Sequence, residues 1–255
     1  MISLLESTKE YIHLFKGIRI STRPDCINQY ILDILKKYNV TSIELGAQSM
    51  DNEVLINNNR GHFAEDVINS SKLIKENGFS LGLQMMTGLY CSDDSKDIYT
   101  ANEFINIKPE TVRIYPTIVM KNTRLAQLYE NNKYSPQTLD DAVNLCSYLL
   151  KIFNENNINV IRLGLHDSQS LKEDMVSGPY HPSFRELCES KLLLDKFLFL
   201  TKNSDSKFFN VYINEKSISK FIGNKKSNLN KLLDLGINVN VNIDNSLSVY
   251  DLSVD

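Results

Sequence analysis

The chain has 255 residues, of which 42% are hydrophobic, and its formal net charge is −3. This length is sufficient for one large domain with a small appendage, and the charge excludes a global basic field that would attract nucleic acid or membrane. No apolar run reaches the roughly 18 residues of a membrane span, and the N-terminal segment is acidic where a secretory signal is basic, so we expect a cytoplasmic protein.

Helical and strand-like patterns alternate along the first two thirds of the chain. The predicted strands are residues 16–25, which end in a turn, and residues 42–49, 79–89, 111–119 and 158–166. The predicted helices are residues 3–15, 26–38, 52–58, 64–77, 92–106, 124–130 and 139–156. This alternation predicts an α/β fold with a parallel sheet or barrel.

The pattern changes near the C-terminus. An irregular stretch, residues 168–182, and a helix, residues 183–200, precede a segment that has a different texture. There we expect a strand at residues 207–214, helices at residues 217–222 and 228–235, and a strand at residues 237–244. The sequence therefore predicts a domain over residues 1–200 and a small α+β domain over residues 207–255.

A short motif occurs three times in the strand-like segments, as SIELGAQS at 42–49, SLGLQMM at 80–86 and VIRLGLHD at 160–167. Each copy has Leu-Gly-x followed by Gln48, Gln84 or His166, side chains that donate and accept hydrogen bonds. Alternate residues of a strand share a face, so parallel strands place these side chains in one layer. The motif predicts a site at the C-terminal mouth of the barrel.

Four segments, in order, resemble the radical S-adenosylmethionine (SAM) superfamily. They are GIRISTRPD, ELGAQSMDNEVLINNNRGH, GLQMMTGL and RIYPTIVMKNTRLAQLYENNKYSP, within residues 16–162. The resemblance is greatest to the elongator catalytic subunit and its bacterial relatives, and the oxygen-independent coproporphyrinogen oxidases are one step further away. It implies a TIM-like barrel in which a 4Fe–4S cluster reductively cleaves SAM, giving a 5′-deoxyadenosyl radical that abstracts hydrogen from substrate.

The resemblance also implies cofactor-binding residues. Gln48 and Gln84 match residues that contact the SAM ribose, and Arg60 matches an arginine that pairs with the methionine carboxylate. Ser21 lies where the porphyrin-pathway enzymes have a glutamate, which favours the elongator-like branch, and Tyr115 would line the mouth. Alternatively, the Gln side chains satisfy loop backbone and Arg60 caps a helix C-terminus.

The chain departs from this family at the cluster. The family's thiolates lie in a C-x-x-x-C-x-x-C loop, whereas the widely spaced Cys26, Cys91, Cys146 and Cys188 form no such motif and no C-x-x-C pair. A glycine-rich strand expected before residue 17 is also absent. We therefore expect a partial barrel that begins at its third strand, is truncated ahead of it, and binds a 4Fe–4S cluster only with the missing portion. Residues 17–22 should then form an open sheet edge, which strand addition or a partner chain would cover.

His166, His181 and Arg185 are candidate substrate residues. His166 can act as an acid or base, or it can be an inward core or loop histidine. For the segment of His181 and Arg185, the alternative is a rigid loop in which Ser183 and Glu186 form a capping box.

The C-terminal segment resembles a minimal KH module with a GxxG-type loop. The loop is Gly223, Asn224, Lys225 and Lys226, so the second glycine is missing. Lysines surround this loop and would suit RNA phosphates, although a lysine-rich face is usually only solvated. Two functions follow as hypotheses: a radical SAM enzyme that acts on RNA or another large substrate, or a non-catalytic module that binds RNA or protein. An aldolase-type barrel fits less well, because no lysine ends a strand and no glycine-rich phosphate loop follows the last strands.

Overall fold

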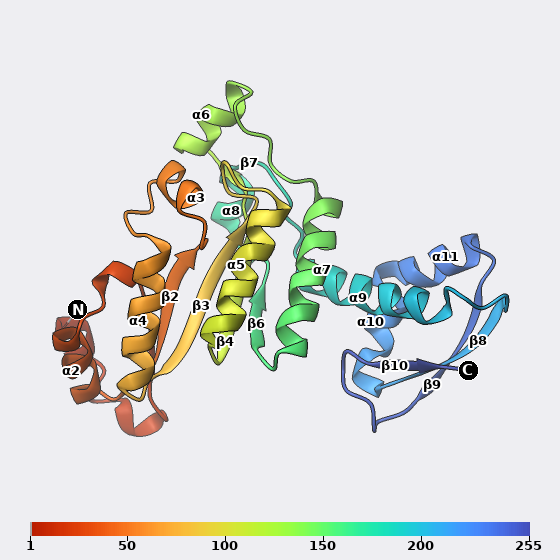
Figure 1. Ribbon diagram of the computed structural model, residues 1–255, viewed down its shortest axis with the longest axis horizontal. Coiled ribbons are helices and arrows are strands. Elements are labelled where there is room, and N and C mark those ends of the chain that lie inside the picture. Colours follow the sequence, from red (N-terminus) through yellow and green to blue (C-terminus); the bar gives the residue numbers. More distant parts are fainter. Residues whose placement is uncertain (1) are drawn as a thin grey trace.

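Five parallel strands form the main sheet of the protein (Figure 1). The computed structural model describes residues 2–255. In their order across the sheet, the strands are β1 (Ile18–Thr22), β2 (Val40–Gln48), β3 (Ser80–Thr87), β4 (Thr111–Pro116) and β6 (Asn159–Leu163). Each neighbouring pair is parallel. The predicted α/β fold, a partial TIM-like barrel of parallel βα units, is therefore confirmed.

Helices cover one face of this sheet, with α4, α5 and α7 side by side in front of it in Figure 1. Their bounds are α2 (Gln29–Lys37), α4 (Ala64–Glu76), α5 (Asp94–Ile107) and α7 (Leu139–Glu155). Because side chains alternate along a strand, Ile43, Leu45 and Ala47 of β2 all face this layer and are fully buried. The opposite face of the sheet carries polar residues.

Shorter elements complete this part of the chain. They are α1 (Ile2–Glu6), α3 (Asn52–Asn57), β5 (Val119–Met120), α6 (Arg124–Glu130), α8 (Gln169–Asp174) and β7 (Met175–Ser177). Three single-turn 3₁₀ helices lie at Ile12–Leu14, Pro24–Cys26 and Glu215–Ser217, and a fourth lies at Asn224–Lys226. Asp51 caps α3, because its Oδ1 atom accepts a hydrogen bond of 3.0 Å from the Val54 amide.

The predicted N-terminal helix over residues 3–15 is wrong in extent, since α1 ends at Glu6. The Ser7 and Thr8 hydroxyls donate to the Ser3 and Leu5 carbonyls, which competes with continued helix. The large apolar side chains of this segment are also mostly exposed: Phe15 is 65% accessible, whereas Leu5 is buried. Without a surface to cover, an amphipathic pattern does not suffice to form a long helix.

The strand predicted at residues 158–166 is too long. β6 ends at Leu163, because Gly164 adopts φ +89° and turns the chain away from the sheet. Gly164 and His166 therefore do not share a strand face, and His166 is exposed. The third copy of the Leu-Gly-x motif is a turn, in contrast to the first two.

The C-terminal part contains α9 (Phe184–Thr201), β8 (Phe208–Ile213), α10 (Ile218–Ile222), α11 (Ser227–Asp234), β9 (Asn238–Ile243) and β10 (Leu252–Val254). Its sheet has the order β10-β8-β9, with β8 and β9 parallel. α9 packs on α7 and also on α10, and the ring of Phe197 meets Phe209 and Phe221 edge-on. The division at residues 201–206 stays a prediction, because α9 belongs to both cores.

β1 is the edge strand of the main sheet, as predicted for residues 17–22. Within residues 2–255, β2 is its only hydrogen-bonded neighbour. No helix in these residues combines the length and apolar character needed to cross a bilayer.

Candidate functional site at the polar face of the sheet

The sheet face opposite the helices carries a buried carboxylate, Glu44, whose side chain is 2% exposed. The carboxylate accepts hydrogen bonds from Ser21 Oγ at 3.3 Å, from Gln84 Nε2, and from Arg113 Nε at 2.8 Å. Four adjacent strands, β1 to β4, thus each contribute one side chain to a single network. Such a network is stable in a buried place only because every charge has a partner.

Tyr115 joins the same network through Arg113, because Arg113 Nη1 donates a hydrogen bond of 3.3 Å to the Tyr115 hydroxyl. This bond and the nearby Glu44 charge together raise the pKa of Arg113 above its ordinary value. The guanidinium therefore remains charged and holds Glu44 in place.

Two glycines make room for these polar side chains. Gly82 lies opposite Glu44 in the β2–β3 pair, and a Cβ atom there would lie 3.1 Å from Glu44 Cγ. A Cβ atom on Gly46 would lie 2.9 Å from Gln48 Nε2. The Leu-Gly-x-Gln motif thus has a packing reason, because a long polar side chain lies over each glycine.

Buried polar atoms without partners gather where β2 ends. Gln48 adopts φ +68° and is buried, and its Oε1 atom has no hydrogen-bond partner in the described chain. Arg60 Nε and His62 Nδ1 are in the same condition. The other ring nitrogen, His62 Nε2, lies 3.1 Å from the Ala47 carbonyl oxygen, which fixes this segment against β2. Native proteins rarely leave such atoms unpaired, so these three mark a place that a ligand can complete.

Arg23 brings a second positive charge to this place. It follows β1 directly, donates to Asp25 at 2.6 Å, and its Nη2 atom lies 3.4 Å from the Gly61 carbonyl oxygen. Burial first, and then the Arg23 charge, lower the pKa of Arg60. Two guanidinium groups side by side, one lacking a counter-ion in residues 2–255, form an anion-attracting corner at the ends of β1 and β2.

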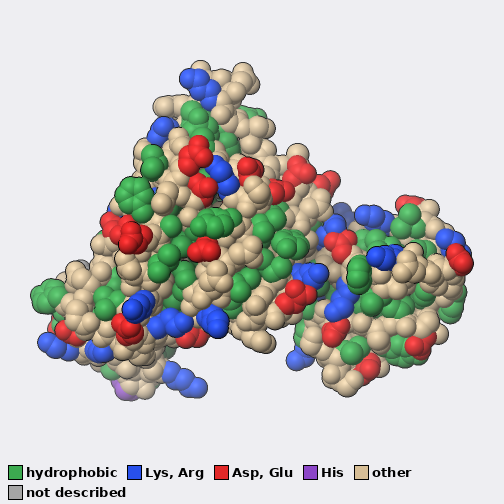
Figure 2. Space-filling model, viewed as in Figure 1, with side chains coloured by type: hydrophobic (Ala, Val, Ile, Leu, Met, Phe, Trp, Pro, Cys, Tyr) green, Lys and Arg blue, Asp and Glu red, His purple; other side chains and the backbone are tan. Residues whose placement is uncertain are grey.

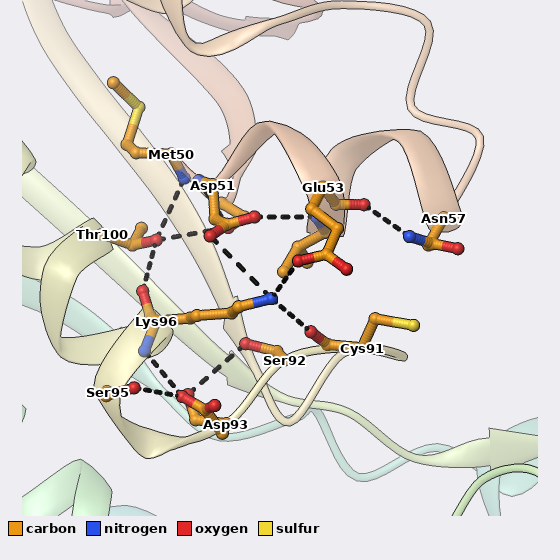
Figure 3. A network of polar contacts seen from close by, with 12 residues as sticks. Met50, Asp51, Glu53, Asn57, Cys91, Ser92, Asp93, Ser95, Lys96 and Thr100 are labelled. Carbon is orange, nitrogen blue, oxygen red and sulfur yellow. Dashed lines mark hydrogen bonds and ion pairs between the residues drawn. The ribbon is translucent and has the colours of Figure 1, made fainter.

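The segment that leads from Gln48 to Arg60 is tied to α5 (Figure 3). Lys96 Nζ lies 2.7 Å from Glu53 and donates to the Cys91 carbonyl at 3.0 Å. Thr100 Oγ1 accepts a hydrogen bond of 3.0 Å from the Met50 amide. These contacts keep the loop after β2 in a fixed position above the sheet.

The structure brings three predicted residues into one network, since Ser21 and Gln84 meet at Glu44 and Tyr115 is reached through Arg113. Gln48 and Arg60 lie at the strand ends. The sequence reasoning missed four residues that matter here, which are Glu44, Arg113, Arg23 and His62. A signal existed for Glu44 alone, because it shares a strand face with Gln48.

The predicted substrate residues lie elsewhere. Arg185 donates to the Val160 carbonyl at 2.8 Å, to Glu189 at 2.9 Å and to the Tyr250 hydroxyl at 3.2 Å, so it joins β6 to the C-terminal part. His181 Nδ1 accepts from the Ser183 amide at 3.1 Å. The alternative capping box is wrong: the Ser183 side chain makes no cap, and the Ser183 amide donates to His181 and not to Glu186.

The KH-like loop follows α10. Gly223 is buried, and a Cβ atom there would lie 3.0 Å from Ser190 Oγ on α9. Its amide donates to Ser219, and the Lys226 amide donates to Gly223. Lys225 and Lys226 are exposed with positive φ. Two of the four loop amides are therefore used internally and are not free to bind a phosphate.

Comparisons with known proteins identify the family of the chain. The profile described as "Radical SAM superfamily" matches residues 3–100, and the "Radical_SAM C-terminal domain" matches residues 109–193. The chain is 32% identical to a tRNA uridine(34) acetyltransferase of Methanocaldococcus jannaschii, over 55% of this chain and 26% of the relative. It is 30% identical to Elongator complex protein 3 of Dictyostelium discoideum, over 69% of this chain and 31% of the relative. The structure of Methanocaldococcus infernus Elp3 with an N-terminal deletion matches with a TM-score of 0.62 and 26% identity, over 71% of this chain and 42% of that one.

The chain belongs to the radical SAM superfamily. It spans about a quarter to a third of the length of these curated relatives. The cofactors of this superfamily are SAM and a 4Fe–4S cluster.

The described residues fit SAM but not the cluster. The unpartnered atoms of Gln48, Arg60 and His62 suit a ligand that has both hydroxyl groups and a carboxylate. For the cluster, residues 2–255 hold no group of three or more His, Cys, Asp or Glu side chains arranged to bind a metal. Burial also raises the pKa of Cys146 to about 12, and that of Cys188 well above its ordinary value, so neither is a ready thiolate ligand.

Proposed function

We propose that the open end of this partial barrel binds S-adenosylmethionine. Arg60, with Arg23 beside it, pairs with the methionine carboxylate, and Gln48 and Gln84 hydrogen-bond to the ribose hydroxyls. The observation that carries the proposal is the group of buried, unpartnered atoms on Gln48, Arg60 and His62 at one strand end. The desolvated Arg60 guanidinium adds to it, because an anion would restore its lost hydration.

Enzymes of this superfamily cleave SAM reductively with a 4Fe–4S cluster, and such a cluster would supply the electron where ligands for it are present. The described residues offer no cluster ligands, so we expect this chain to bind SAM without cleaving it. The names of its relatives support RNA as the large substrate, because two of them are called tRNA uridine(34) acetyltransferases.

Calorimetric titration with SAM tests the proposal. Arg60→Lys keeps the charge but removes the bidentate fork, and it should weaken SAM binding about tenfold. Arg124→Lys on α6 is the matched control, since Arg124 is exposed and makes none of the site contacts described above, and it should bind as the wild type does. After anaerobic reconstitution with iron and sulfide, the same sample should form no 5′-deoxyadenosine. Absence of SAM binding to the wild-type chain would overturn the proposal.

RNA contact by the C-terminal part is the second candidate. The exposed Lys225 and Lys226 favour it, because both project from a loop at the start of α11. Binding of a single-stranded RNA should weaken steeply as salt rises, and Lys225→Gln with Lys226→Gln should reduce that salt dependence. Binding that does not respond to salt would exclude this candidate.

A further inference from the structure

We propose that Glu44 is a positioning residue that fixes which end of the Gln84 amide faces the ligand. This inference rests on the proposed function, because it concerns the ribose contact of the same site. Glu44 itself lies too deep to contact a ligand, since its side chain is 2% exposed. It acts through Gln84, because its carboxylate accepts a hydrogen bond from the Gln84 amide.

The direction of the Gln84 amide follows from the chemistry of its partner. A carboxylate only accepts hydrogen bonds, so the Gln84 atom that faces Glu44 must be the NH₂ group. The Gln84 carbonyl oxygen is then turned away from Glu44, and it is neither buried nor hydrogen-bonded in residues 2–255. Gln84 therefore presents an acceptor, which selects a ligand group that donates, such as a ribose hydroxyl.

Glu44 can do this because its own position is fixed. Ser21 on β1 donates to one carboxylate oxygen, and Arg113 on β4 donates to the other. Gly82 leaves the space that the side chain occupies, since a Cβ atom at that position would crowd Glu44 Cγ at 3.1 Å. Both oxygens of the Glu44 carboxylate are hydrogen-bonded, so the carboxylate is fixed in one orientation. The Gln84 amide that donates to it is therefore fixed in one orientation too.

The ligand-free protein tests the orientation. In a ¹⁵N spectrum the Gln84 side-chain amide is identified by its loss in Gln84→Leu, and Gln127, which is exposed on α6, is the internal control. We expect the Gln84 NH₂ protons to exchange with solvent at least about tenfold more slowly than those of Gln127, because a buried carboxylate holds them. Equal exchange rates would overturn the inference, whatever the protein binds.

The ligand consequence is tested with S-adenosylhomocysteine and its 2′-deoxy and 3′-deoxy analogues. One of the two analogues should bind the wild type about tenfold more weakly than the parent, because the Gln84 oxygen loses its donor. In Glu44→Gln the amide of Gln84 can turn either way, so this discrimination should fall to about threefold or less. Thermal unfolding of Glu44→Gln establishes that the variant is folded.

A double-mutant cycle separates positioning from a general structural role. If Glu44 acts through Gln84, Glu44→Gln should change S-adenosylhomocysteine affinity less than about twofold in the Gln84→Leu background. An equal loss in both backgrounds would contradict the inference. No binding of S-adenosylhomocysteine to the wild type would instead overturn the proposed function, and the exchange measurement would still decide the orientation.

Discussion

At the scale of single residues, side chains on the polar face of the sheet fix one another in position through hydrogen bonds. Glu44 contacts three side chains from three other strands, and Arg113 links it to Tyr115. Gln48 and Arg60 differ, because each keeps a buried atom without a partner in residues 2–255. The network around Glu44 therefore supports the site, and Gln48 and Arg60 are the residues that we expect to contact a ligand.

A second buried carboxylate, Asp97, gives a prediction about pH. Its oxygens accept from the Gly88 amide at 2.8 Å and from Ser92 Oγ at 2.6 Å, and they hold the loop after β3. Burial raises its pKa from 3.8 to about 6, so the folded state binds more protons than the unfolded state between these values. This shift stabilises the folded state fully below pH 3.8, and the stabilisation is lost as pH rises through about 6. The contribution of Asp97 to the free energy of unfolding therefore changes by an amount on the order of 3 kcal/mol.

Asp97→Asn should flatten this pH dependence, because the uncharged amide can accept from the Gly88 amide with its oxygen and donate to Ser92 Oγ with its NH₂ group. We expect its free energy of unfolding at pH 7 to rise by about 1–2 kcal/mol, with little change at pH 4. Urea unfolding at the two pH values measures this, and Asp234→Asn on exposed α11 serves as the control. A variant that is less stable than the wild type at pH 7 would show that the ionised carboxylate is needed.

At the scale of elements, the ends of strands are decided by contacts that a sequence pattern does not contain. Gly46 and Gly82 lie inside strands, whereas Gly164 in a similar motif ends one. The difference lies in the backbone, because Gly164 has φ +89° whereas Gly46 and Gly82 keep strand conformation, and Phe184 on α9 packs against Gly164.

Gly164→Ala should therefore be much more costly than an ordinary glycine substitution. A Cβ atom there would lie 2.9 Å from Phe184 Cβ, at φ +89°. We expect a loss of about 2–4 kcal/mol in the free energy of unfolding, from backbone strain and overpacking together. Gly78→Ala is the matched control, because Gly78 has φ +81° but open space around it, and it should lose only about 1–2 kcal/mol. Equal losses for the two variants would mean that Phe184 moves to accommodate the new methyl group.

Strand and helix periodicity was sufficient to predict the parallel sheet, and the family resemblance predicted its open edge at β1. Periodicity did not predict the Glu44–Arg113 pair, whose members are 69 residues apart and look like ordinary strand residues. It also overextended the first helix, because an apolar stripe shows amphipathicity but not whether a core exists to receive it.

At the scale of the whole molecule, one cluster joins the two sheets through α9. Arg185 connects the Val160 carbonyl of β6 with Glu189 and Tyr250, and Lys220 approaches Glu189 at 3.1 Å. Although burial opposes ionisation, hydrogen bonds from Tyr250 and Arg185 lower the pKa of Glu189. The carboxylate therefore stays charged and depends on its cations.

Arg185→Met should destabilise the protein by about 2 kcal/mol, because it leaves Glu189 and the Val160 carbonyl short of a donor. Lys191→Ala is the control on the same helix: its ion pair with Asp195 is exposed, and we expect a loss below about 0.5 kcal/mol. Urea unfolding measures both variants. Equal effects would mean that the junction does not depend on this cluster.

The open sheet has a kinetic consequence. β1 lacks a further strand partner in the described part of the chain, so the polar face is open along that side, whereas α9 packs on β6 and its Arg185 donates to the Val160 carbonyl. A closed barrel retains its ligand partly by surrounding it, whereas a sheet with an open edge must rely more on a few directional bonds. Molecules that bind here should have short residence times, with escape past β1 as well as through the end of the barrel.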